Sequence, residues 1–224
     1  MEKLALLIRK LARGFVILIL SLLFGALVLP CACLASYDDA APTDWFYPSV
    51  VYVTDRKALL GVTSKSFKPE MTLTRARYVE ALYRLSGSPP PASKNPFSDV
   101  DNNYMYAAAI RWAAEENITV GVGSNCFAPY AIVTREEAAS MLYRYLCRSG
   151  VSVDIHDFRC SDYDEVSTWA KDAVAFVAEH GLFHEEDIGV FLPKQPLSRA
   201  DAAYCLMKLD QTISCCKNQD CTAK

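Results

Sequence analysis

The chain has 224 residues, of which 52% are hydrophobic and 22% are charged. That composition excludes a disordered tail or a collagen-like repeat, and the length is enough for one or two domains with a buried core. Beyond residue 35 the chain carries 19 basic and 25 acidic residues. Because nucleic-acid binding draws most of its affinity from a basic surface, we expect no nucleic-acid partner.

The first 35 residues have the organisation of a secretory signal peptide. Four basic residues precede an apolar run of 15 residues, Phe15–Leu29, and Cys33 and Ala35 fit a small-x-small cleavage site. The alternative is an uncleaved membrane anchor, but a membrane span needs about 20 apolar residues. We therefore predict that residues 1–35 are removed on export, and that the chain contacts the membrane only through this segment if it stays uncleaved.

Seven cysteines follow the predicted signal peptide, and an odd number leaves at least one thiol outside any intrachain pairing. Export to an oxidising compartment favours disulfides among them. Their spacing is not that of a paired CxxC zinc site, and no histidine lies near the C-terminal group, so no metal site and no cofactor is expected. The seven are Cys126, Cys147, Cys160, Cys205, Cys215, Cys216 and Cys221.

One unit recurs three times along the rest of the chain. A Phe-x-Pro triplet occurs at 67–69, 127–129 and 191–193, at spacings of 60 and 64 residues. Five residues after each proline a hydroxyl residue precedes an arginine, in Thr74-Arg75, Thr134-Arg135 and Ser198-Arg199. Upstream apolar residues keep the same two spacings, as in Val50, Ile110 and Val174. Each unit is therefore predicted to be a helix, a glycine-bearing loop, a Phe-x-Pro turn and a second helix.

The predicted fold class is all-α, because one two-helix unit cannot bury its apolar stripe alone and three should pack as one body. The repeats span residues 37–88, 95–149 and 158–210, and a cysteine-containing tail, 211–224, looks loose. Each second helix follows Thr or Ser, which are preferred N-caps. Thr134 and Glu137 are predicted to form a capping box, Ser198 and Asp201 a shortened one, and Arg77 removes the reciprocal bond in the first repeat.

These motifs resemble the S-layer homology (SLH) domain family, and the resemblance covers residues 37–210. The family signature is an aromatic-rich first helix, a glycine-containing loop, a Phe-x-Pro turn and a Thr-Arg-Ala-Glu motif that opens the second helix. The second repeat matches it best, with Phe-Ser-Asp-Val at 97–100, Ala-Ile-Arg-Trp-Ala at 109–113, Gly-Val-Gly-Ser-Asn-Cys-Phe-Ala-Pro at 121–129 and Thr-Arg-Glu-Glu at 134–137. One Thr-Arg pair would be weak evidence, whereas three in register with Phe-x-Pro are specific.

The resemblance implies a secreted protein held non-covalently at the cell wall and surface of a Gram-positive-type bacterium. Three SLH repeats would form a pseudo-threefold, three-pronged body that holds an anionic secondary cell-wall polysaccharide, often pyruvylated, in grooves between the prongs. The motif arginines and the backbone of the glycine loops would contact it, and other envelope or S-layer proteins are a second class of partner. The candidate ligand-binding residues are Arg135, Gly121, Gly123, Thr134, Glu137, Arg75, Gly61, Thr74 and Arg199.

The motif arginines fall in the first turn of a helix, where the macrodipole disfavours a cation. A guanidinium beside a helix N-terminus suits a carboxylate or a phosphate. The alternative is that each arginine pairs with an acid inside the fold, which would make the chain an envelope protein–protein interaction module without glycan binding. Gly121 and Gly123 favour a main site near Arg135, with a second near Arg75, while the acids at 185–187 oppose an anion in the third repeat.

No enzyme activity is expected, because the chain has no Gly-x-Ser-x-Gly motif, no phosphate-cradling glycine loop and no cysteine in a nucleophile context. His180 and His184 are interpreted as a solvated helix end rather than a metal site. The large aromatic residues are expected mostly in the core, with one or two exposed at a groove where they could stack on sugar faces. They are Trp45, Tyr106, Trp112 and Trp169.

Overall fold

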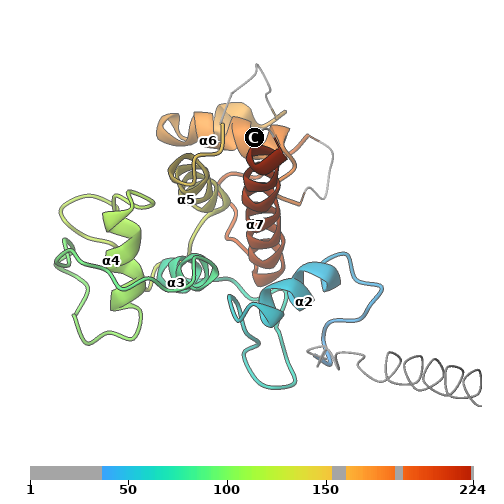
Figure 1. The fold of residues 1–224 in the computed structure, drawn as a ribbon, viewed down its shortest axis with the longest axis horizontal. Coiled ribbons are helices and arrows are strands. Elements are labelled where there is room, and N and C mark those ends of the chain that lie inside the picture. The colour runs from blue at the N-terminus through green and yellow to red at the C-terminus, as the bar shows by residue number, and fades with distance from the viewer. Residues whose placement is uncertain (1–36, 153–159, 185–188, 223–224) are drawn as a thin grey trace, which may run out of the picture. The chain divides into compact units, whose positions relative to one another are not determined.

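The computed structural model describes residues 37–152, 160–184 and 189–222, the last six of them by their backbone alone. Over these residues the chain forms six α-helices, two short 3-10 helices and no strand (Figure 1). The helices are α2 (Tyr47–Asp55), α3 (Arg75–Leu85), α4 (Ala107–Glu115), α5 (Arg135–Arg148), η1 (Tyr163–Glu165), η2 (Thr168–Ala170), α6 (Lys171–Glu179) and α7 (Arg199–Thr222). The predicted all-α class is confirmed, and the predicted signal peptide lies outside the described residues.

The second helix of each repeat packs mainly against the first helix of the next repeat. Helix α3 of the first repeat packs against α4 of the second, α5 packs against α6 of the third, and α7 returns to pack against α2 (Figure 1). The helix-loop-helix unit seen in the sequence is therefore not the packing unit. Each pair of packed helices is shared between two repeats, which explains why one repeat cannot bury its own apolar stripe.

A ring of three backbone hydrogen bonds joins the repeats where their second helices begin. The amide of Leu73 donates to Leu197 (3.1 Å), that of Leu197 to Val133 (2.9 Å), and that of Val133 back to Leu73 (3.0 Å). All three side chains are fully buried. Because each repeat donates one bond and accepts one, the ring closes with pseudo-threefold symmetry, in agreement with the repeat spacing in the sequence.

The first helix of each repeat is short and presents one fully buried residue in the predicted register, Val50, Ile110 or Val174. Two residues beyond each of these helices the backbone turns to positive φ, at Lys57 (56°), Asn117 (57°) and Gly181 (58°). A left-handed residue of this kind ends a helix because it turns the chain away from the helix axis. The chain thus leaves each first helix toward the loop that precedes the Phe-x-Pro turn.

An aspartate carboxylate holds each Phe-x-Pro turn. In the second repeat the carboxylate of Asp99 accepts the backbone N–H groups of Phe127 (2.8 Å) and Ala128 (2.7 Å). Asp39 and Asp162 hold the other two turns in the same way. The middle residue of each turn has positive φ, between 56° and 60° at Lys68, Ala128 and Leu192. Two backbone donors fixed on one carboxylate therefore stabilise a left-handed conformation that a non-glycine residue otherwise resists.

Helix α7 corrects the prediction of a loose tail, because it continues as a helix to Thr222. Ile213 is buried, and the side chain of Asp210 accepts hydrogen bonds from Tyr52 (2.8 Å) and Arg56 (2.9 Å) of the first repeat. These contacts lie close enough to residue 211 to anchor the start of the extension. None of the helices described in this part of the chain, α7 included, combines the length and apolar character that a membrane crossing requires.

The predicted disulfides are not found among the thiols at positions 126, 147, 205, 215 and 216, which are free. Cys205 is fully buried beside Tyr78, and burial raises the pKa of its thiol to about 12. A thiol in that environment behaves as a small apolar residue rather than as a nucleophile. Cys221 lies in the part of α7 whose side chains are outside the described residues.

Candidate binding grooves between the repeats

Each motif arginine reaches across to the Phe-x-Pro turn of the next repeat. The Nε of Arg75 donates to the carbonyl of Phe127 (2.9 Å), that of Arg135 to Phe191 (2.7 Å), and that of Arg199 to Phe67 (2.6 Å). The exposed fractions of the three arginines are 3%, 4% and 1%. Each guanidinium also lies over the ring of the phenylalanine that it bonds, 4.5–5.1 Å from the ring centroid. The arginines therefore tie neighbouring repeats together.

Two of the three arginines have a carboxylate partner on the helix that follows the turn. Arg75 Nη1 lies 2.8 Å from Glu137 Oε1, and Arg135 Nη1 lies 3.2 Å from Asp201 Oδ1. Glu137 also completes the predicted capping box with Thr134, which is confirmed. Buried ion pairs of this kind hold an arginine in one orientation, because an uncompensated charge in the interior is costly.

The third arginine, Arg199, lacks such a partner because Arg77 occupies the position that Glu137 and Asp201 occupy in the other repeats. Arg199 instead donates through Nη2 to the carbonyl of Leu60 (2.7 Å). Burial, followed by the nearby charge of Arg77, lowers its pKa to about 10. Two cations thus share one corner of the molecule without an acid between them.

A groove lies beside each arginine, and its walls come from three different repeats. We name each groove by its buried arginine. The Arg75 groove, about 360 Å³, includes the side chains of Arg75, Gly121, Glu137, Ser140, Arg144 and Trp169. The Arg135 groove, about 290 Å³, includes Trp45, Glu70, Arg135, His184, Ser198 and Asp201. The Arg199 groove, about 130 Å³, includes Leu60, Gly61, Arg77, Glu80, Arg84 and Arg199.

The charge of the lining residues differs strongly from groove to groove. Three arginines face one glutamate in the Arg199 groove, and two arginines face one glutamate in the Arg75 groove. One arginine faces two acids, Glu70 and Asp201, in the Arg135 groove. Because an anion gains most where cations exceed acids, the groove that Arg135 lines is the least suited of the three to an anionic group.

The Arg75 groove combines three features of a ligand site. The hydroxyl of Ser140 is buried and has no hydrogen-bond partner in the described part of the chain. Arg144 is half-buried, and burial lowers its pKa, yet it makes no ion pair with a described residue. Trp169 is 57% exposed at the rim, and Gly121 brings the loop backbone close. An apolar wall with a few unsatisfied polar groups is the usual composition of a small-molecule or sugar site.

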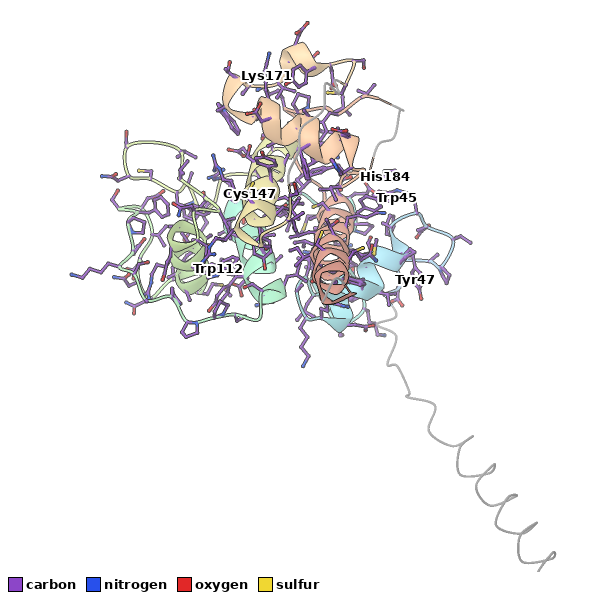
Figure 2. The ribbon with its side chains drawn as sticks, turned by 45° about the horizontal axis from the view of Figure 1, so that its top comes forward. Trp45, Tyr47, Trp112, Cys147, Lys171 and His184 are labelled. Atoms are coloured by element: carbon purple, nitrogen blue, oxygen red, sulfur yellow. The ribbon has the colours of Figure 1, made fainter. Side chains whose placement is uncertain are left out.

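The Arg135 groove is closed from above by two aromatic rings. The ring of His184 stacks on that of Trp45, with 3.6 Å between centroids and an interplanar angle of 10° (Figure 2). The carbonyl of His184 accepts a hydrogen bond from Arg135 Nη2 (3.1 Å). The face of Trp45 that could stack on a ligand is therefore covered by the protein itself.

The structure groups the predicted site residues differently from the sequence. Gly121 and Glu137 lie beside Arg75 rather than Arg135, and Gly61 lies beside Arg199, because each arginine crosses into the next repeat. Reasoning along one repeat therefore attached the glycine loop to the wrong arginine. A Cβ on Gly121 would lie 2.4 Å from the carbonyl oxygen of Cys126, and its φ is +76°, so the loop requires glycine there.

The remaining candidates are structural or lie outside the groove walls. Thr74 and Thr134 cap α3 and α5, each accepting the backbone N–H three residues on at 3.4 Å. Gly123 has φ of +104° with open space around it, and it is not among the residues that line the three grooves. Among the aromatics, Trp112 is buried as predicted, whereas Trp45 and Trp169 are 43% and 57% exposed.

Sequence reasoning missed Ser140 and Arg144, which lie one and two turns into α5 beyond the motif. Helical spacing carries the available signal, because positions 137, 140, 141 and 144 fall on one face of a helix. It also missed the turn aspartates. Asp39, Asp99 and Asp162 are spaced by 60 and 63 residues, so the third falls one residue out of the repeat register.

Comparison with known proteins identifies the three segments. The model of the family described as "S-layer homology domain" matches residues 36–76, 96–139 and 161–203. The chain is 32% identical over 162 residues to an exoglucanase, XynX, of Acetivibrio thermocellus, which covers 71% of this chain and 15% of that protein. It is 27% identical over 148 residues to a cellulosome-anchoring protein of the same organism (64% and 33%).

An S-layer protein of Bacillus thuringiensis subsp. finitimus is also similar, at 22% identity over 178 residues, covering 79% of this chain and 21% of that protein. The chain therefore spans between 15% and 33% of the length of these three relatives. What they share with it is the region of the three repeats.

Proposed function

The chain belongs to the S-layer homology domain family, and from that premise we propose that it attaches non-covalently to the wall by binding an anionic secondary cell-wall polysaccharide in the grooves between its repeats. It is a cell-surface protein associated with the cell wall of Gram-positive-type bacteria. The family segment is a binding module, and relatives with catalytic names carry it as only a small part of a longer protein.

The observation that carries the proposal is the Arg75 groove. The unpartnered hydroxyl of Ser140 costs about 1–3 kcal/mol as long as nothing bonds to it. A sugar hydroxyl or amide would remove that cost, and the uncompensated charge of Arg144 would attract a carboxylate on the same sugar. Trp169 offers an exposed ring against which the apolar face of a pyranose can stack.

Arg75 itself acts in this groove as a positioning residue. Its Nε and Nη1 are occupied by the carbonyl of Phe127 and the carboxylate of Glu137, and almost none of its surface is exposed. By holding the turn after Gly121 it fixes the loop that forms one wall of the groove. The direct contacts therefore fall to Ser140, Arg144 and Trp169.

The second candidate function is an envelope protein–protein interaction module. The burial of all three motif arginines favours it, because they are satisfied inside the fold without any ligand. Val120 and Val122, both exposed, extend the apolar surface beside Trp169 and could equally contact a protein. A glycan ligand and a protein partner differ in what must be removed from the wall to abolish binding.

Co-sedimentation of the full chain with cell-wall sacculi tests the proposal. Binding should require the secondary wall polymers and should fall about tenfold or more in Arg144→Gln, because a charge-assisted contact contributes about 1.5–3 kcal/mol. Trp169→Ala should weaken binding as well. Arg148→Gln is the matched control, since Arg148 lies four residues further along α5, is exposed, and does not line the Arg75 groove.

Binding that survives removal of the polymers would favour the protein-interaction module. Polymer-dependent binding that is unchanged in Arg144→Gln and Trp169→Ala would keep the function and move the site to another groove.

A further inference from the structure

The Arg199 groove departs from its two counterparts at a single residue. Where Glu137 and Asp201 pair with Arg75 and Arg135, this groove has the exposed side chain of Arg77. Arg84 is paired with Glu80 at 2.7 Å, but neither Arg77 nor Arg199 forms an ion pair with a described residue. The groove thus holds two cations whose charge nothing in the described chain offsets.

Arg77 also violates two local rules of helix construction. It lies in the first turn of α3, where the positive end of the helix dipole disfavours a cation. The carboxylate normally at this position would bond back to the N-cap amide, and α3 has only the single bond from the Arg77 amide to Thr74. A residue that lowers stability in two ways, beside a buried arginine that it repels, indicates a functional requirement.

The size of the hollow limits what it can accept. At about 130 Å³ it has roughly a third of the volume of the Arg75 groove, so it suits a small charged substituent rather than a whole sugar ring. Through Leu60 and Arg84 it continues into a neighbouring hollow that Arg56 and Lys57 also line. The basic surface therefore extends beyond the groove along the direction in which a polymer could run.

We propose that the Arg199 groove binds a phosphate group as a dianion, held by the guanidinium groups of Arg77 and Arg199. Two uncompensated cations match two negative charges, and planar guanidinium groups bond phosphate oxygens in pairs. The same chemistry fits a phosphate carried by a wall polymer or free inorganic phosphate. The inference rests on the proposed function only for the first of these two sources.

The sharpest test is Arg77→Glu, which restores the arrangement of the other two grooves. Glutamate at this position can pair with Arg199 and complete the capping box with Thr74, so the variant should be more stable than the natural protein. It should also lose phosphate binding. Because the variant is expected to fold better, loss of binding cannot be attributed to unfolding. Arg77→Gln removes the charge without adding an acid and should weaken binding by about tenfold or more.

The measurement is isothermal titration of the full chain with inorganic phosphate at constant ionic strength, together with the thermal midpoint with and without phosphate. Phosphate should bind the natural protein and raise its midpoint, because a ligand that binds only the folded state stabilises it. Lys94→Glu is the matched control: it makes the same charge change on an exposed linker residue and should bind phosphate as the natural protein does. Absence of binding to the natural protein, or unchanged binding in Arg77→Glu, overturns the inference.

Co-sedimentation with sacculi separates this inference from the proposed function. If phosphate competes with sacculi for the natural protein but not for Arg77→Glu, the phosphate belongs to the wall polymer. If phosphate binds without competing, the groove serves the free ion. Sacculi binding that depends on Trp169, without any phosphate binding, overturns this inference and leaves the proposed function intact. Phosphate binding without sacculi binding does the reverse.

Discussion

Replacing Arg135 with alanine should destabilise the whole body rather than remove a ligand contact. The substitution leaves the carbonyls of Phe191 and His184 without their donor and Asp201 without its cation. Breaking a buried ion pair by removing one partner costs about 3–5 kcal/mol. Asp201 is 18% exposed and can recover some hydration, so the lower end of that range is expected. A domain of this kind has a total stability of about 5–15 kcal/mol, so this loss is a large fraction.

Urea unfolding of the natural protein, Arg135→Ala and Arg144→Ala measures this directly. Arg135→Ala should lose about 3 kcal/mol or more, whereas Arg144→Ala should lose less than about 1 kcal/mol and still lose sacculi binding. Arg135→Lys should fall between, because lysine keeps the charge but cannot form the fork of bonds to two carbonyls and a carboxylate. A loss of less than about 1 kcal/mol in Arg135→Ala would refute the view that the motif arginines are ties between repeats.

Three further predictions follow from the turns, the glycine loop and the extension of α7. Gly121→Ala should lower the thermal midpoint much more than Gly123→Ala, because the added Cβ meets the carbonyl of Cys126 at 2.4 Å in the first case and open space in the second. The turn carboxylates have pKa values below the ordinary 3.8, since burial, which alone would raise them, is outweighed by the backbone donors. Their stabilising contribution is therefore complete above that value and is lost as the pH falls through the lower folded-state pKa; the urea midpoint of Asp99→Asn should differ from that of the natural protein at pH 6 and converge with it near pH 2–3. Asp210→Ala should lose about 1 kcal/mol or more and speed hydrogen exchange in α2 and α7, because Tyr52 and Arg56 both bond that carboxylate.

The fold was largely predictable from the sequence because three copies of one pattern constrain each other. The helix registers at Val50, Ile110 and Val174, the caps at Thr74 and Thr134, and the capping box all follow from local rules that the structure obeys. What local rules cannot give is which copy packs against which. Nothing in the pattern of a single repeat distinguishes pairing α3 with α2 from pairing it with α4.

That one undetermined feature also decided the site. Because packing passes from each repeat to the next, every groove draws its arginine from one repeat and its glycine loop from the following one, as in Arg75 with Gly121. The extension of α7 past Gln211 escaped prediction for a related reason. Its polar, cysteine-rich sequence has little amphipathic pattern of its own, and the helix is supported by contacts with the first repeat at Tyr52 and Arg56.

The closed ring has a consequence for how the three grooves can differ. The backbone ring, the turn aspartates and the crossing arginines are the same in all three repeats, so the framework does not depend on the groove walls. Each wall can then change by single residues without loss of the fold, as position 77, 137 or 201 does by carrying Arg, Glu or Asp. Three walls of different charge and size on one rigid frame allow one polymer chain to be held at several chemically distinct groups at once, and linked weak contacts of this kind give tight binding because the later ones form intramolecularly.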